Sequence, residues 1–198
     1  MRLSAENVRR VVEFARRGRV VVVDTETTGC SRWDEICQIA SAEFVNGTLV
    51  RTASEYVLPT CEMTPGAEAV HGLSMDFLRL RGSDPAAAMG RFFEFLGEDA
   101  LFVAHNVPFD RGMIERECAK FGLPCPLRGV ETCCTLALSR RLHPELASHA
   151  LGRLLGPLGV EDAVNSHDAL DDVMACAGVF FRLVSELEAG LADGGASS

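Results

Sequence analysis

The feature that most constrains the fold is an apolar run without a polar break, residues 21–23, which ends in Asp24-Thr25-Glu26. An uninterrupted run of valines is typical of a buried strand. Because strand side chains alternate, Asp24 and Glu26 point to the same side and can approach one cation together. The sequence therefore predicts a buried strand with two carboxylates at its tip, after which Gly29 lets the chain turn away.

A second motif lies at residues 102–110, where a short apolar strand gives way to His105 and Asn106. Pro108 follows, and proline is favoured at the first position of a helix. Apolar residues then recur at three- and four-residue intervals, which predicts a helix. Asp110 accordingly falls in its first turn, with its carboxylate facing the mouth of a site.

A third motif, residues 166–172, opens a long amphipathic segment and contains His167 and Asp172. In one regular helix these two residues would lie about 140° apart, on different faces. We therefore expect His167 in the loop that leads into the helix. Asp171 competes with Asp172 for any role at this site, because neighbouring acids readily share a helix start.

Each motif taken alone also has a structural interpretation. Asp24 and Glu26 are compatible with a solvated strand end, and His105-Asn106 with a plain turn. His167 and Asp168 are compatible with an N-terminal helix cap. The occurrence of all three motifs in order constrains about a dozen positions and favours a shared function.

Together the motifs resemble those of the DEDDh 3′→5′ exonucleases, a family that includes the proofreading subunit of bacterial DNA polymerase III. The family patterns Asp-x-Glu-Thr-Thr-Gly, His-Asn-x-x-Phe-Asp and His-x-Ala-x-x-Asp match residues 24–29, 105–110 and 167–172. The likeness covers roughly residues 18–187. Two positions depart from the pattern: Glu131 replaces the usual aspartate, and Cys30 follows the Thr-Thr-Gly segment.

The resemblance implies a two-metal site in which Asp24, Glu26, Asp110 and Asp172 hold two divalent cations. Mg²⁺ or Mn²⁺ is expected, because both prefer oxygen ligands. The likeness further implies that Asp24 bridges both ions and that His167 is the general base. By its position in the family motif, Asp172 is preferred over Asp171.

Further residues are candidates for binding the terminal nucleotide. For His105, Asn106 and Phe109, packing beside Asp110 is an equally good account, and for His71 a structural role is the alternative. The candidate substrate-binding residues are Thr25, Thr27, Thr28, His71, His105, Asn106 and Phe109.

The expected function is that of an exonuclease releasing nucleoside 5′-monophosphates from single-stranded or frayed ends. DNA is slightly favoured over RNA, and the expected partners are nucleic-acid 3′ ends and a DNA polymerase. One alternative is a catalytically silent nucleic-acid-binding or polymerase-binding module, and another is an RNA- or oligonucleotide-trimming phosphodiesterase. The chain has no glutamine-led sliding-clamp segment, since its only glutamine, Gln38, falls inside an expected strand.

Composition sets further bounds. The 198 residues are 47% hydrophobic, which suits one exonuclease domain over residues 1–190 followed by a disordered tail over 191–198. Neither a run of transmembrane length nor a secretory signal is recognisable, so no membrane association and a cytoplasmic location are expected. The eight cysteines lack Cys-x-x-Cys spacing and are expected to be reduced.

The net charge of −9 is unusual for a nucleic-acid enzyme. Either bound cations neutralise the site and the protein contacts only a few phosphates, or a partner protein supplies the affinity for nucleic acid. Arg140 and Arg141 contact phosphates or, equally well, complement the end of a helix.

The patterns predict an α/β, ribonuclease H-like mixed sheet with helices on both faces. Asn46-Gly47 predicts a hairpin turn. Strands are expected at 19–25, 36–45, 48–58, 101–104 and 128–131, and helices at 4–17, between 66 and 80, from 85 to 96, and at 107–121, 132–142, 149–155 and 168–189.

Overall fold

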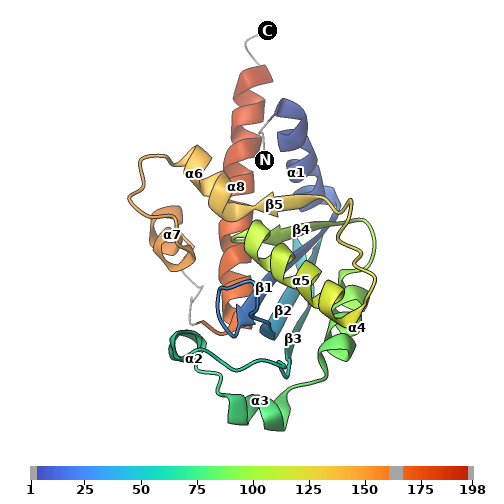
Figure 1. Cartoon of the computed structure of the whole chain (residues 1–198). Coiled ribbons are helices and arrows are strands. Elements are labelled where there is room, and N and C mark those ends of the chain that lie inside the picture. The colour runs from blue at the N-terminus through green and yellow to red at the C-terminus, as the bar shows by residue number, and fades with distance from the viewer. Residues whose placement is uncertain (1–3, 161–166, 196–198) are drawn as a thin grey trace.

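The computed structural model describes residues 4–160 and 167–195. Within these residues a five-stranded sheet has the order β3-β2-β1-β4-β5 (Figure 1). Strand β1 is antiparallel to β2 and parallel to β4; β2 and β3 are antiparallel, and β4 and β5 are parallel. The predicted mixed sheet is thus confirmed. The strands are β1 Arg19–Thr27, β2 Ile36–Val45, β3 Thr48–Tyr56, β4 Ala100–Ala104 and β5 Thr132–Cys134.

Helices cover both faces of this sheet, as predicted. Helices α1, α6, α7 and α8 contribute to one apolar core, and α4 and α5 contribute to the other. The long α8 runs beside α1, and α2 and α3 link β3 to α4 (Figure 1). The helices are α1 Ala5–Arg17, α2 Pro65–His71, α3 Met75–Arg81, α4 Pro85–Leu96, α5 Val107–Phe121, α6 Thr135–Leu142, α7 Leu151–Leu158 and α8 Ala169–Gly195.

The valine run forms the centre of β1. Val20 and Val22 belong to the core under α8, whereas Val21 and Val23 belong to the core under α5. Each of these four side chains is at most 1% exposed. A central strand covered on both faces needs apolar residues at every position, which explains the absence of alternation.

The alternating direction of side chains along a strand also decides where the polar residues at the end of β1 point. Asp24 and Glu26 continue the series that faces α8, and Thr25 continues the series that faces α5. The two acids therefore share one face of the strand, as the two-residue spacing predicts. The same strand end can meet one helix on each side of the sheet.

The connection between β2 and β3 is the predicted tight hairpin. Asn46 and Gly47 both have positive φ, at 52° and 77°. A two-residue turn with two positive φ angles matches the twist of the flanking strands. Asparagine and glycine tolerate this conformation better than other residues.

The short strand expected near residues 128–131 is present but lies later in the chain, because residues 128–129 form a turn. Gly129 has a φ of 84°, and the Val130 amide donates to the Leu127 carbonyl. Strand β5 follows at Thr132–Cys134, where Cys133 pairs with Val103 of β4. Helix α6 consequently begins at Thr135, later than the predicted residue 132.

The boundaries of two helices also differ from the predictions. Helix α7 begins at Leu151 rather than residue 149, with Ala150 as its N-cap, and ends at Leu158 rather than residue 155. Helix α8 continues to Gly195, into the segment predicted to be a disordered tail, and Leu191 there packs against the core under α8. Residues 196–198 lie outside the described residues, and the assignment of one domain to residues 1–190 stays a prediction.

All eight cysteines are free thiols, in agreement with the reduced state that their spacing suggested. Among the helices of residues 4–160 and 167–195, none combines the length and the apolar character needed to cross a bilayer.

Candidate active site

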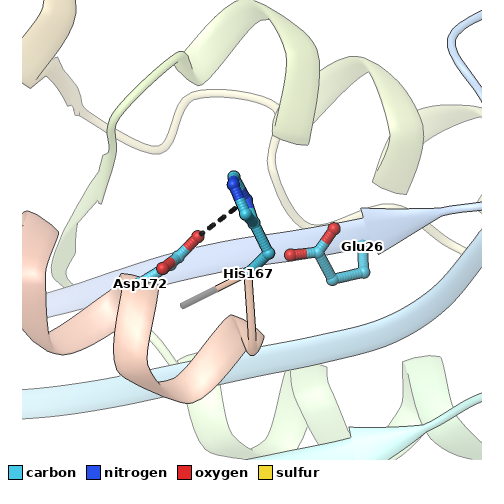
Figure 2. A group of neighbouring side chains, drawn as sticks. All are labelled: Glu26, His167 and Asp172. Carbon is cyan, nitrogen blue, oxygen red and sulfur yellow. Dashed lines mark ion pairs between the residues drawn. The ribbon is translucent and has the colours of Figure 1, made fainter. Parts of the chain in front are cut away.

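Side chains from segments distant in the sequence meet at the end of β1. Glu26 of β1, His167 of the lead-in to α8 and Asp172 of α8 offer ligand atoms that all lie within 4.8 Å of one another (Figure 2). Asp110 of α5 approaches the same strand end from the other face, where the Thr25 hydroxyl donates a 2.9 Å hydrogen bond to its Oδ1. The structure thus brings together the residues of all three motifs.

Asp24, Glu26, Asp110 and Asp172, here called the acidic cluster, repel one another. Burial raises the pKa of Asp24 well above its ordinary value, and the charges of Asp110, Glu26 and Asp172 raise it further. Burial also raises the pKa of Glu26 to about 7, with added effects of Asp172 and Asp110. Carboxylates gathered in this way hold their charge best when a cation lies between them.

Asp110 occupies the first turn of α5, as predicted from Pro108, which stands at the start of that helix. Its side chain is 4% exposed. Burial raises the pKa of Asp110 to about 7, although the hydrogen bond from Thr25 acts in the opposite direction. Asp110 is therefore buried, and the direction of its carboxylate toward the mouth of a site stays a prediction.

His167 lies in the loop that leads into α8, as the helix geometry predicted. It has a φ of 58°, and α8 begins two residues later. Its side chain is 52% exposed, and its Nδ1 lies 3.9 Å from Oδ2 of Asp172. This spacing is too long for a hydrogen bond but short enough for electrostatic attraction when the imidazole is protonated.

The competition between Asp171 and Asp172 is decided by the direction of α8. Asp172 is 5% exposed and adjoins Glu26 and His167, whereas Asp171 faces outward. Two consecutive residues of a helix point about 100° apart, so only one of them can face β1. The structure places Asp172 there.

Asp168 caps α8, as the capping interpretation held. Its Oδ1 accepts a 3.0 Å hydrogen bond from the Leu170 amide, and its carbonyl accepts one from the Asp172 amide. The Asp168 charge also contributes to the raised pKa of Glu26. Asp168 therefore combines the structural role with an electrostatic effect on the cluster.

Gln38 of β2 fastens the start of α8, a role that the sequence analysis missed. Its Nε2 donates to Asp168 Oδ2 at 3.3 Å and to Ser54 Oγ at 3.1 Å, and its Oε1 accepts from the Ala169 amide at 3.4 Å. A buried amide needs such partners. The signal in the sequence was a glutamine between the apolar residues Cys37 and Ile39 of an expected strand.

The hydroxyl groups of Thr25, Thr27 and Thr28 all have internal partners. Thr25 donates to Asp110, Thr27 donates to the Gly29 carbonyl at 2.7 Å, and Thr28 donates to Asp34 at 3.1 Å. These hydroxyls brace the end of β1. Contact of the three threonines with a substrate stays a prediction.

His71 holds the end of α2 against β1. Its Nδ1 accepts a 3.1 Å hydrogen bond from the Leu73 amide, and its Nε2 lies 3.2 Å from the Thr27 carbonyl. Burial lowers the pKa of His71, and the nearby His167 lowers it further. A neutral ring with its proton on Nε2 satisfies both contacts.

His105 has a structural role in the region that the structure describes. Its Nδ1 lies 2.9 Å from the Thr135 hydroxyl, and its Nε2 lies 2.9 Å from the His149 carbonyl. Burial lowers the pKa of His105. Both ring nitrogens are therefore engaged with partners inside the protein. Contact of His105 with a substrate stays a prediction.

Asn106 and Phe109 differ from each other in exposure. Asn106 is the exposed N-cap of α5 and makes no side-chain cap hydrogen bond. Phe109 is partly buried and packs against the core under α5. Substrate binding by these two residues stays a prediction.

Glu117 is a second residue that the sequence analysis missed. It lies two turns after Asp110 on the same side of α5, and its Oε1 accepts a 2.9 Å hydrogen bond from the Ile36 amide. A β-bulge shifts the pairing of β1 with β2 between Glu26 and Thr27, at the position of Ile36. Bulges commonly re-aim a side chain next to a functional site, and Glu117 supplies the acceptor here.

Arg140 and Arg141 lie in the last turn of α6 and are exposed. This is the position at which positive charge complements a helix dipole. Contact of either arginine with phosphate stays a prediction.

The donor set of the acidic cluster suits a hard divalent cation. Its members offer carboxylate oxygens, which Mg²⁺ and Mn²⁺ prefer. Burial raises the pKa values of Glu26 and Asp110, and neighbouring carboxylates raise that of Glu26 further, so a bound cation would favour their charged forms. His167 adds one nitrogen within 4.8 Å of Glu26 and Asp172. The residues present therefore fit the metal ions that are typical of the family they resemble.

The family model described as exonuclease, of the RNase T type, matches residues 21–180. The PolC-type DNA polymerase III of Staphylococcus saprophyticus is 31% identical over 170 residues, covering 85% of this chain and 12% of that protein. The Staphylococcus aureus protein of the same name is 31% identical over 169 residues, covering 85% and 11%. This chain thus spans about a tenth of the length of these relatives.

Solved structures share the fold. Escherichia coli exonuclease I in complex with a dT13 oligonucleotide matches with a TM-score of 0.77 and 22% identity, over 88% of this chain and 42% of that chain. Exonuclease X in complex with 5′-overhanging duplex DNA matches with a TM-score of 0.66 and 25% identity, over 84% and 92%. The ribonuclease H-like α/β fold is thereby confirmed. The chain belongs to the exonuclease family and resembles its DEDDh-type members in all three motifs.

Proposed function

We propose that this protein is a metal-dependent 3′→5′ exonuclease that releases nucleoside 5′-monophosphates from single-stranded or frayed ends. The observation that carries the proposal is the convergence of the acidic cluster with His167. Its carboxylates come from β1, α5 and α8; burial raises the pKa values of Asp24, Glu26 and Asp110, and neighbouring carboxylates raise those of Asp24 and Glu26 further. Such an arrangement destabilises the protein unless cations bind, which favours a site kept for chemistry.

Asp24, Glu26, Asp110 and Asp172 would hold two divalent cations, Mg²⁺ or Mn²⁺. When bound, such ions stabilise charge on the attacking and leaving oxygens of a phosphodiester. The buried Thr25–Asp110 hydrogen bond fixes one carboxylate before any ion arrives. The hydrogen bond from the Ile36 amide to Glu117 stabilises the β-bulge beside Glu26.

His167 would act as the general base for the attacking water. It is the half-exposed member of the site and projects from a loop, whereas Asp172 beside it is buried. A ring nitrogen takes the proton from water, and the Asp172 carboxylate stabilises the imidazolium that forms. Oxygen ligands suit the expected cations better than imidazole, which favours this role over metal ligation for His167.

DNA is the proposed substrate, with RNA as the closest competitor. Support for DNA comes from exonuclease I and exonuclease X, whose solved complexes contain an oligonucleotide dT13 and duplex DNA. The Staphylococcus relatives are DNA polymerases, which supports a DNA polymerase as a partner of this chain. The expected cytoplasmic location stays a prediction.

The test uses 3′-labelled and 5′-labelled single-stranded DNA and matched RNA in Mg²⁺. Stepwise shortening from the 3′ end is expected, with DNA degraded faster than RNA. Asp172→Asn should abolish it, whereas the neighbouring, outward-facing Asp171→Asn should retain it and serves as the matched control.

Faster degradation of RNA would replace the DNA substrate by the RNA-trimming alternative. Binding of both strands without cleavage, in Mg²⁺ and in Mn²⁺, would contradict the exonuclease and indicate the catalytically silent binding module.

A further inference from the structure

The loop between β1 and β2, residues 28–35, carries the protein's one tryptophan, Trp33. Its side chain is 73% exposed. Tryptophan is usually largely buried, so an indole left in water is informative about binding. The guanidinium of Arg32 lies over the indole, with its central carbon 4.5 Å from the ring centroid.

The base of this loop is closed by backbone hydrogen bonds. The Thr28 amide donates to the Glu35 carbonyl at 2.9 Å, and the Glu35 amide donates to the Thr28 hydroxyl at 3.0 Å. The buried carboxylate of Glu35 accepts further hydrogen bonds from Thr60 and Lys120. The loop is therefore anchored to the body of the protein.

The tip of the loop is also ordered by its own side chains. Asp34 accepts hydrogen bonds from the Ser31 amide at 2.6 Å and from the Thr28 hydroxyl at 3.1 Å, and the Ser31 hydroxyl accepts from the Trp33 amide at 3.2 Å. Gly29 passes so close that a Cβ there would lie 2.7 Å from the Asp34 carboxylate. The backbone that presents Trp33 is thus held before any ligand binds.

The tip of this loop lies close enough to the acidic cluster to contact a nucleic-acid strand whose end is bound there. Trp33 is two residues from Glu35, and Thr28, which pairs with Glu35, is two residues from Glu26. At about 3.6 Å per extended residue, the Trp33 backbone lies at most roughly 20 Å from that of Glu26. A single-stranded nucleic acid with its 3′ end at the acidic cluster would cover this distance with a few nucleotides.

We propose that Trp33, backed by Arg32, is a stacking platform for a base of the single-stranded substrate, a few nucleotides upstream of its 3′ end. The proposal rests on the proposed function and names a binding residue for it. Aromatic faces bind any unpaired base, and an arginine beside them attracts the phosphates. On a protein with a net charge of −9, a cation at the loop tip is well placed for this purpose.

A nucleic-acid base fits this loop better than a protein surface does. Protein-binding sites typically expose contiguous apolar patches. In the described residues, the other exposed large apolar side chains lie on β3, α2 and α3, and not on this loop. Trp33 is accordingly an aromatic ring beside a cation, in a polar loop.

The first test follows the fluorescence of Trp33, which no other tryptophan obscures. The full chain with Asp24→Asn is titrated in Mg²⁺ with a dT12 oligonucleotide and, as control, with an abasic strand of equal length. Quenching by dT12 but not by the abasic strand is expected. The absence of quenching by dT12 at concentrations where it binds would overturn the proposal.

The second test separates the platform from catalysis. Trp33→Ala should raise the KM for dT12 about 10-fold, a typical loss for one stacked base, with kcat unchanged. Hydrolysis of a p-nitrophenyl ester of thymidine 5′-monophosphate, which is too small to reach the loop, should be unaffected, and Trp33→Phe should restore most of the KM. Leu80→Ala, a truncation of an 81% exposed side chain on α3, is the matched control.

Equal KM values for Trp33→Ala and the unaltered protein would overturn the platform. If the unaltered protein cleaves neither the oligonucleotide nor the ester, the proposed function fails, and the fluorescence titration still decides whether Trp33 contacts bases.

Discussion

Replacing Glu26 by glutamine is expected to stabilise the metal-free protein at pH 8, although it removes a residue of the proposed active site. Burial and the neighbouring carboxylates raise the pKa of Glu26 from its ordinary value of 4.5 to about 7. Because the pKa is higher in the folded state than in the unfolded state, ionisation destabilises the fold. The penalty is absent below pH 4.5, grows as the pH rises, and is complete above pH 7.

The size of the effect follows from the same values. One pKa unit corresponds to about 1.36 kcal/mol, so ionising Glu26 in the folded protein costs roughly 3 kcal/mol. The side chain is partly exposed, and screening by solvent reduces this to about 1–2 kcal/mol. For a protein of this size each kcal/mol changes the Tm by about 2–4 °C, so Glu26→Gln should raise the Tm by about 2–8 °C.

Thermal unfolding followed by circular dichroism in EDTA tests this reasoning at pH 8 and at pH 5. The gain should be complete at pH 8 and largely lost at pH 5. Saturating Mn²⁺ should raise the Tm of the unaltered protein more than that of Glu26→Gln, because the variant lacks one carboxylate ligand. Glu94→Gln, at an exposed position on α4, controls for the loss of one surface charge. A Tm of Glu26→Gln equal to or below that of the unaltered protein at pH 8 in EDTA would refute the electrostatic argument.

Three further predictions concern the residues around the cluster. His167→Ala should lower kcat about 10²–10⁴-fold and retain the rise in Tm that Mn²⁺ produces. Loss of that rise would instead indicate that His167 is a metal ligand. Glu117→Leu leaves the Ile36 amide without its acceptor and should lower the free energy of unfolding, measured in urea, by about 1–3 kcal/mol. Glu117→Gln keeps an acceptor and should leave that free energy nearly unchanged. Equal losses in the two variants would argue against the hydrogen bond. Gly29→Ala would place a Cβ 2.7 Å from the Asp34 carboxylate and should cost about 1–3 kcal/mol in the same assay, and an unchanged unfolding midpoint would contradict that close approach.

Much of the architecture could be predicted because its signals are local. The valine run of β1, the Asn46-Gly47 turn and the proline at the start of α5 each reflect the conformational preferences of a few neighbouring residues. The position of the short strand β5 could not be predicted in this way. It is set by the pairing of Cys133 with Val103, a contact between segments far apart in the chain.

The sequence by itself determined which residues are candidates for the chemistry, since the two-residue spacing in β1 and the five-residue spacing before α8 limit the directions in which those side chains point. Only the tertiary structure decided how they are held. The direction of α8 selected Asp172 over Asp171, and hydrogen bonds between strand β2 and the helices on either face of the sheet assigned supporting roles to Gln38 and Glu117. The physical reason is that burial and pairing of polar groups depend on which elements pack together, and local propensities do not contain that information.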